Sequence, residues 1–427
     1  MTEIFKSDLL GEHYTRFLHA SGLPIYVFPK KMTSTYALFA TDFGAVDTAP
    51  IGESGLVPPS GVAHFLEHKL FECEDGSDAF EHFSALGADA NAYTSHTRTV
   101  YLFSSTEHFS EALGELIDFV THPFFTKKSV KKEQGIIAEE IRMCRDNPYD
   151  TCYYNMLEGL YKDHPVKTDI CGSVASIGEI TPEVLYTVYN TYYTPENMAL
   201  VICGDVTMEE VLRVVDRHLP RSYTAGTTPP RVTVEEAPEA HRARVSAKGQ
   251  VAKPIFSIGF KDTRIPTEPV ERLKRDAAMA ILCEMLFSEA GELYNALFDE
   301  GLISPELSSD YALTRDFAFV QLSGEAGDPE LVLSRVLDAL ERIKKEGLSA
   351  EDFERCRRIE YAEYIKSFDN IEEIANTLLS FVFEGAELFS YAEVLQSIDL
   401  EFVNALLCEV FCPSHVTLSV IFPKEEV

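Results

Sequence analysis

Positive charge is scarce in this sequence of 427 residues, and the shortage limits the partners that it can bind. Lys and Arg number 37 against 69 Asp and Glu, which gives a formal net charge of -32. A chain this acidic is poorly suited to nucleic acid or to an anionic membrane surface. Its acidity would favour basic or neutral peptides, although acidity also serves simply to keep a protein soluble. Tryptophan is absent too, with no functional consequence that the sequence reveals.

A cysteine framework and long apolar runs are also missing. The nine cysteines form no Cys-x-x-Cys pair, and Cys203 and Cys283 lie within apolar runs, as small buried side chains do in a reducing compartment. No apolar run approaches the roughly 18 residues that span a bilayer. Residues 1–8 carry early acidic side chains and no apolar signal-peptide segment. These features predict a cytoplasmic protein.

Residues 61–72 carry a metal-binding pattern, His64-x-x-Glu67-His68, on a predicted helix with Ser60 as its expected N-cap. Histidines four residues apart share one helix face, so both imidazoles can reach one ion. Glu67 projects toward the same side and can take a proton from an attacking water. This order is that of the inverzincins. On these residues alone, an amphipathic helix with His and Glu at its polar boundary explains the pattern equally well.

A later helical stretch, residues 128–145, offers the third protein ligand that a catalytic zinc site needs. Glu133 and Glu140 are seven residues apart, or about 10 Å along a helix, so only one of them can bind the ion. Ile137 and Ile141 mark that side as facing the interior, where carboxylates are rare unless paired or bound to metal. The spacing predicts one ligand and one supporting carboxylate without deciding between them.

These motifs resemble those of the M16 family of pitrilysin-like and insulinase-like zinc metallopeptidases, in the short subfamily that contains mitochondrial processing peptidase. The resemblance covers essentially the whole chain and is strongest in residues 20–220. Three blocks carry it in order: His64-x-x-Glu67-His68, residues 87–95 with 99–101, and Glu133-x6-Glu140.

The resemblance implies a role for each site residue. His64, His68 and Glu140 would bind Zn²⁺, and Glu67 would act as the general base. Glu133 would orient a ligand or stabilise the site electrostatically, as carboxylates next to metal ligands do.

The resemblance also implies a substrate strand. The segment with Asn91 and Ala92 would lie beside the zinc, where the peptide substrate adds to it through main-chain hydrogen bonds. From its residues alone, this segment is an ordinary strand with an Asn near a turn.

The predicted fold is α+β, with two similar halves that each pack an antiparallel sheet with helices. We expect a zinc-bearing half at residues 1–222, a linker at 223–244, which contains paired prolines, and a degenerate second half at 245–427.

An internal repeat supports two halves. A helix, a residue pair ending in Pro195 and a strand recur in the second half around Pro413. In a weaker echo of the His64 helix, Ile281 and Met285 replace the two histidines, so the second half would bind no zinc in this way.

One family feature is missing. M16 enzymes carry an Arg and a Tyr in the second half, in a pattern like Leu-Arg-Glu-x-x-Gly-Leu-x-Tyr, which help to stabilise the developing oxyanion. In the matching stretch, residues 293–304, Ser304 occupies the Tyr position. Leu297 occupies the Arg position, or Phe298 if one residue is deleted.

This departure suggests that an M16-like partner subunit supplies the Arg and Tyr. A homodimer with weak activity, or donors recruited from Tyr311 or Arg315, are the alternatives.

The function predicted is a zinc-dependent endopeptidase that cleaves peptides or small unfolded proteins within a closed chamber, as one subunit of a heterodimer. The alternative is a non-catalytic M16-like subunit that scaffolds or binds a partner. A purely structural zinc would leave Glu67 without a role.

Overall fold

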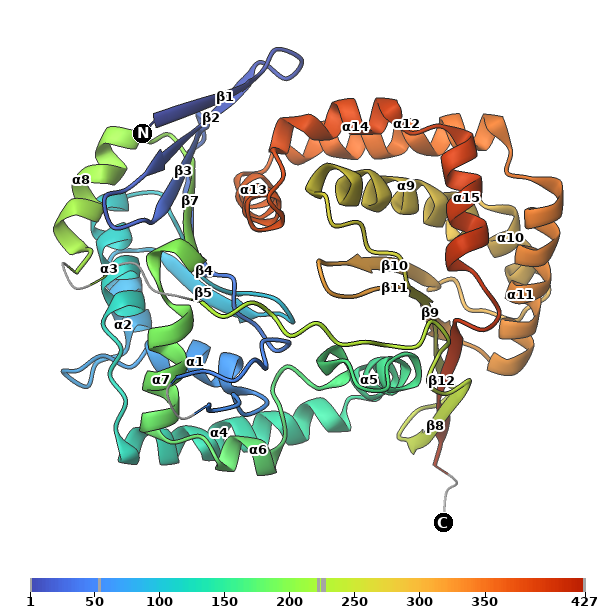
Figure 1. Cartoon of the computed structure of the whole chain (residues 1–427), viewed down its shortest axis with the longest axis horizontal. Helices are drawn as coiled ribbons and strands as arrows, with labels where there is room; N and C mark the ends of the chain where they lie inside the picture. The colour runs from blue at the N-terminus through green and yellow to red at the C-terminus, as the bar shows by residue number, and fades with distance from the viewer. Residues whose placement is uncertain (1, 53–54, 221–222, 224–227, 425–427) are drawn as a thin grey trace. The chain divides into compact units, whose positions relative to one another are not determined.

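The computed structural model describes residues 2–52, 55–220, 223 and 228–424. The chain forms two compact units, and most of their helices and strands are labelled in Figure 1. Unit 1 takes the described residues of 1–141, 168–232 and 365–383, and unit 2 takes those of 142–167, 233–364 and 384–427. The units therefore do not follow the order of the chain. The predicted linker at 223–244 falls partly on residues 224–227, and its boundary on 222, which lie outside the described residues.

Unit 1 is built on a seven-stranded sheet in the order β1-β2-β3-β7-β4-β6-β5. Its strands are β1 (Thr2–Ser7), β2 (Glu12–Leu18), β3 (Pro24–Pro29), β4 (Thr35–Thr41), β5 (Asp89–Thr94), β6 (Thr99–Ser105) and β7 (Met198–Gly204). The N-terminal hairpin β1–β2, which the sequence analysis did not identify, lies at one edge of the sheet (Figure 1). Strand β5 forms the other edge.

Helices pack against this sheet around one large apolar core. The helices of unit 1 are α1 (Val62–Leu70), α2 (Ala79–Ala85), α3 (Phe109–Thr121), most of α4 (Lys127–Asp146), α6 (Val174–Gly178), α7 (Pro182–Tyr192), α8 (Met208–His218) and most of α13 (Ile371–Glu384). Two of these helices begin at capping side chains. The Thr181 side chain caps α7, and Thr207 with Glu210 forms a capping box at the start of α8.

Unit 2 repeats the plan on a smaller sheet with the order β10-β11-β9-β12-β8. Its strands are β8 (Arg244–Gly249), β9 (Ile255–Asp262), β10 (Ser308–Leu313), β11 (Ala318–Glu325) and β12 (Val416–Pro423). Its helices are α5 (Pro148–Leu160), α9 (Pro269–Phe287), α10 (Glu292–Asp299), α11 (Pro329–Glu346), most of α12 (Ala350–Ser367), α14 (Tyr391–Ser397) and α15 (Leu400–Val410). As the repeat predicts, α15 leads into β12 as α7 leads into β7.

The α+β class with two similar halves is confirmed, but both sheets are mixed rather than antiparallel. Strands β3 and β7 pair in parallel, and so do β12 and β8, while the other neighbours are antiparallel. Parallel neighbours need long crossover connections. In each half the parallel pair joins an early strand to a late one, and a strand-by-strand interpretation of the sequence does not reveal such long-range pairing.

Helix α13 joins unit 1 although most of its chain neighbours belong to unit 2. The Tyr93 hydroxyl at the end of β5 donates a hydrogen bond to Asn376 Oδ1 at 3.0 Å. Arg98, in the turn between β5 and β6, donates to Ser380 Oγ at 2.7 Å. A late segment of the chain thus braces the edge hairpin of unit 1.

Cys203 and Cys283 are buried, as expected, and none of the nine cysteines, all of which lie among the described residues, forms a disulfide. Among the described residues, no helix has the length and apolar character that crossing a bilayer requires.

Arg231, which lies within the predicted linker, is anchored in unit 1. Its guanidinium donates to Asp47 at 2.9 and 3.3 Å, to Asp42 at 2.9 Å and to the Thr97 carbonyl at 2.6 Å. Only 4% of the Asp47 side chain is exposed, and burial raises the pKa of this carboxyl to about 6 although Arg231 opposes the shift. Arg231 therefore ties the chain to the turn that connects β5 and β6.

Replacing Arg231 with Ala should destabilise unit 1 by about 3–5 kcal/mol, because it leaves Asp47 buried without its cation. Arg335→Ala is the matched control. Arg335 pairs with Glu300 at 3.0 Å, but both side chains are nearly half exposed, so its loss should cost at most about 1 kcal/mol. Chemical denaturation followed by circular dichroism measures both. Equal losses would show that the Arg231 cluster is no more stabilising than a surface pair.

Candidate metal centre

Helix α1 presents the His-x-x-Glu-His pattern because its other face is anchored in the core. Val62, Phe65, Leu66 and Leu70 are buried at helical spacing. The predicted N-cap at Ser60 is wrong. The N-cap is Gly61, with a left-handed φ of 87° and no side-chain hydrogen bond.

A close backbone contact explains the glycine cap. A Cβ on Gly61 would lie 2.5 Å from the Cys171 carbonyl oxygen, and a Cβ on Gly172 would lie 2.5 Å from the Ser60 carbonyl oxygen. Gly172 also has a positive φ, of 76°. Two glycines thus allow the residue 171–172 loop to press against the start of α1. The contact fixes where this helix begins, three residues before His64.

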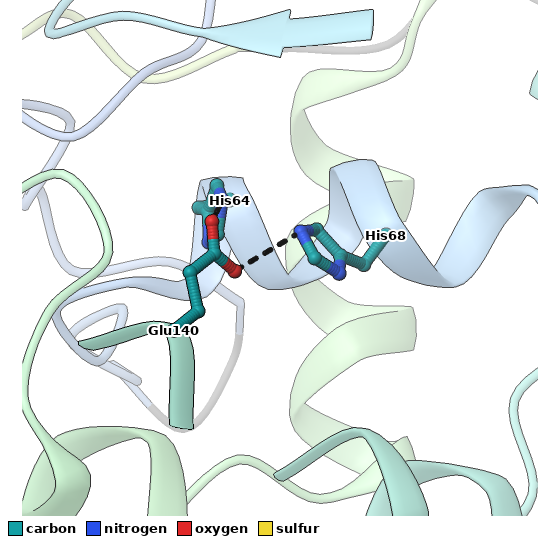
Figure 2. A group of neighbouring side chains, drawn as sticks. All are labelled: His64, His68 and Glu140. Atoms are coloured by element: carbon teal, nitrogen blue, oxygen red, sulfur yellow. Dashed lines mark ion pairs between the residues drawn. The ribbon is translucent and has the colours of Figure 1, made fainter. Parts of the chain in front are cut away.

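Figure 2 shows the carboxylate of Glu140, from α4, facing the two imidazoles on α1. Glu140 Oε1 lies 3.5 Å from His64 Nε2, and Glu140 Oε2 lies 3.5 Å from His68 Nε2. One donor atom from each residue falls within 4.8 Å of the other two. The structure thus brings together the three residues expected to be ligands.

The spacing of these atoms fits a zinc ion. Tetrahedral zinc with ligand distances of about 2.0–2.2 Å separates its ligand atoms by roughly 3.3–3.6 Å. Each imidazole nitrogen lies 3.5 Å from one of the two Glu140 oxygens, a separation that falls in that range. Neutral imidazoles and a carboxylate are a donor set that suits zinc. The hydrogen bond with His64 and the charges of both histidines also hold the pKa of Glu140 below its usual value, so the carboxylate is ionised.

Glu133 occupies a position behind His68, on the turns of α4 before Glu140. Its Oε1 lies 3.0 Å from His68 Nδ1, the ring nitrogen that faces away from Glu140. Burial lowers the pKa of His68, but the hydrogen bond to Glu133 and the charges of Glu140, Glu133 and Glu67 outweigh it and raise the pKa. A carboxylate on Nδ1 keeps the proton there and leaves Nε2 free to bind an ion. The two glutamates thus make different contacts: Glu140 faces both imidazoles, whereas Glu133 bonds to the far side of His68. Their spacing in the sequence alone could not distinguish them.

Glu67 is held from the other side by the sheet. Its Oε2 accepts a hydrogen bond of 2.5 Å from the hydroxyl of Thr94, at the end of β5. The hydroxyl of Thr99 lies 3.5 Å from that of Thr94 and donates to the Phe43 carbonyl. Thr94 was not among the site residues predicted from the sequence. The signal available was its position in the same block as Asn91 and Ala92.

A cavity of about 520 Å³ in unit 1 opens beside these residues. It brings together the predicted base, a predicted ligand, the supporting glutamate and the predicted substrate strand: Glu67, His68, Glu133, Asn91 and Ala92. Phe71, Phe80 and Ile136 supply apolar walls. Among the charged lining residues, four acids, Glu67, Glu72, Asp78 and Glu133, outnumber Lys132, so the cavity is acidic overall.

Asn91 and Ala92 lie on the edge strand β5, whose sheet partner is β6. The Ala92 N–H donates to the Asn91 side-chain oxygen at 2.9 Å. This backbone donor is thus bonded to an exposed side chain at the edge of the sheet, where another acceptor can replace it.

Cys171 is a second residue that the sequence did not single out. Its Sγ lies 3.9 Å from His64 Nε2, the nitrogen that faces Glu140. Its position follows from the two-glycine contact, which joins residues about a hundred positions apart, so nothing in its local sequence marks it.

The expected Arg and Tyr positions lie in unit 2. Leu297 is buried in the core on α10, and Phe298, the next residue, is 45% exposed. The Ser304 backbone N–H donates to the Glu325 carbonyl. Tyr311, one alternative donor, already donates its hydroxyl to Asp262 at 2.7 Å.

Two family models match the chain. Residues 58–173 match the model described as insulinase (peptidase family M16), and residues 179–360 match the peptidase M16 inactive domain.

Individual proteins are similar over nearly the full length. The uncharacterized zinc protease YmfH of Bacillus subtilis is 38% identical over 410 residues, which cover 95% of either chain. The crystal structure of an M16-like peptidase from Alicyclobacillus acidocaldarius superposes with a TM-score of 0.91 at 33% identity, covering 96% of this chain and 98% of that one. A protease from Helicobacter pylori shares the fold, with a TM-score of 0.84 at 18% identity, over 96% of this chain and 100% of that one.

Gly61→Ala should destabilise the protein by at least about 2 kcal/mol and weaken zinc binding, because the new Cβ pushes the start of α1 away from residue 171. Gly11→Ala is the control. Gly11 also has a positive φ, of 65°, but nothing within 4 Å of an added Cβ, so strain alone should cost about 1 kcal/mol. Denaturation curves and zinc titration of both variants test the contact. Unchanged zinc affinity in Gly61→Ala would contradict it.

Proposed function

This chain belongs to the M16 family of zinc proteases, and we propose that it is an endopeptidase that cleaves peptides or small unfolded proteins at the centre formed by α1 and α4. We propose His64, His68 and Glu140 as the zinc ligands. Glu67 is the proposed general base, and Glu133 the proposed support for His68.

One observation supports this assignment above the others. A single carboxylate lies 3.5 Å from the Nε2 atoms of two imidazoles, with Glu67 on the same helix and lining the adjacent cavity. A scaffold subunit gains nothing from holding a carboxylate against one buried and one partly buried histidine. A structural zinc site is usually closed by four protein ligands, whereas these three leave a position open.

The chain's own groups supply the proton transfers. When bound, zinc would polarise the scissile carbonyl and acidify the attacking water. The Glu67 carboxylate takes the proton from that water and passes it to the leaving amine nitrogen. The Thr94 hydroxyl bonds to Glu67 Oε2 and orients the carboxylate. Glu133 holds the proton on His68 Nδ1.

The edge of β5 suits an extended substrate. A peptide laid along β5 would accept the Ala92 N–H that now bonds to Asn91, and its side chains would enter the cavity. The apolar walls favour a hydrophobic side chain there, and the surrounding acids disfavour an acidic one.

We also propose a partner subunit. Neither Leu297 nor Phe298 nor Ser304 can donate a charged or phenolic hydrogen bond to an oxyanion, and Tyr311 is engaged by Asp262. A related M16 chain that supplies an Arg and a Tyr would complete the site within a closed chamber. The homodimer is the competing arrangement.

Glu67→Gln should keep zinc and lose about 10²–10⁴-fold in kcat, because it removes the proton acceptor and leaves the three ligands in place. His68→Ala should lose both zinc and activity. Elemental analysis and hydrolysis of a quenched fluorescent peptide measure the two properties separately.

Glu139→Gln is the matched control for Glu67→Gln, since Glu139 is an exposed glutamate next to a proposed ligand. It should leave both properties unchanged. Full peptide hydrolysis by Glu67→Gln would refute its role as base.

The partner is tested by tagging Glu67→Gln, recovering bound chains from the native cell, and reconstituting the wild-type chain with each. A partner that carries the Arg and Tyr should raise kcat/KM by about 10²-fold or more, as restored oxyanion donors do. The same partner with Arg→Ala and Tyr→Phe should bind without activating. A lone chain that is already as active as any mixture would favour the homodimer.

A further inference from the structure

A second cluster of metal-ligating side chains lies in unit 1, apart from the ligands proposed above. Cys73, His82 and Glu115 each place one donor atom within 4.8 Å of the other two. His82 Nδ1 lies 2.6 Å from Glu115 Oε1. All three side chains are partly buried.

Three separate elements hold these donors. Cys73 lies in the turn after α1, and its N–H donates to the Ser77 carbonyl at 3.0 Å while its carbonyl accepts from Gly76 at 3.0 Å. His82 is on α2, and Glu115 is on α3, which packs against α2. The tertiary structure therefore brings these three donors together.

The charges around the thiol favour a cation. The negative charges of Glu115, Asp75 and Asp78 act on the Cys73 thiol, and those of Glu115 and Asp75 act on His82. These acidic side chains favour a positive charge next to Cys73 and His82, and a divalent ion would supply more of that charge than a proton does.

We propose that Cys73, His82 and Glu115 bind a second divalent ion of the zinc type. A thiolate, an imidazole and a carboxylate suit Zn²⁺ and exclude Mg²⁺ and Ca²⁺, which prefer oxygen ligands. The fourth position falls to water or to Asp75, whose charge acts on both Cys73 and His82.

Such an ion would fix one wall of the substrate cavity. Glu72 and Asp78 form a β-bridge that closes the turn containing Cys73. Both residues, with Gly76 and Ser77 between them, line the cavity that also contains Glu67 and His68. Linking Cys73 to α2 and α3 would hold this turn in place while a peptide binds.

Zinc content tests the site independently of catalysis. The His64→Ala, His68→Ala double variant of the full chain removes the first cluster and should retain about one Zn²⁺ per chain after dialysis against metal-free buffer. Adding Cys73→Ser, or separately Glu115→Gln, should remove that ion. Wild type should hold about one ion more than the double variant. Circular dichroism of each variant checks that it is folded.

Cobalt substitution identifies the ligand. The double variant loaded with Co²⁺ should show a sulfur-to-cobalt charge-transfer band in the near ultraviolet, because Cys73 supplies a thiolate. The band should vanish in Cys73→Ser and persist in Cys171→Ser, the control for the thiol next to His64.

A folded double variant that holds no zinc would overturn the proposal, as would a cobalt band that survives Cys73→Ser. Failure of the catalytic assignment has a different signature, since it would leave wild type and the double variant with equal zinc content.

Discussion

The structure of the centre depends on one meeting point, where the carboxylate of Glu140 lies 3.5 Å from two imidazole nitrogens. Two histidines on one helix need no fold to bring them together, but a carboxylate from another helix does. Gly61 and Gly172 fix the start of α1, Thr94 holds Glu67 from the sheet, and Glu133 holds His68 from α4. The precision of the centre therefore comes from contacts behind the donor atoms.

The two halves differ in the free-energy cost of burying polar side chains. In α9, Ile281 and Met285, which the weaker sequence repeat predicts at the positions of the two histidines, are both buried. Apolar residues there contribute to packing without the penalty of burying polar groups. The first half accepts that penalty at α1, where His64 is buried and a carboxylate is held beside it.

The sequence predicts most of the fold and the centre wherever the signal is local. Spacing on a helix points to His64, Glu67 and His68 as one group, and the repeat around Pro195 and Pro413 predicts that α15 leads into β12 as α7 leads into β7. The remaining features are long-range. Cys171 next to His64, the parallel pair β3–β7 and the cap at Gly61 all arise from segments that meet only in the folded chain. The residue pattern of a short sequence segment contains no information about such long-range contacts.

The placement of α13 in unit 1 constrains when unit 1 can finish folding during synthesis. Unit 1 begins with the first strands, yet Tyr93 and Arg98 find their partners at Asn376 and Ser380. A chain emerging from the ribosome exposes its N-terminal segments first and folds them as they emerge. The β5–β6 hairpin next to Glu67 therefore lacks its hydrogen bonds to Asn376 and Ser380 until translation has nearly finished. If the β5 edge binds substrate as proposed, a nascent chain is without its complete substrate edge while the rest of that chain is still unfolded and open to cleavage.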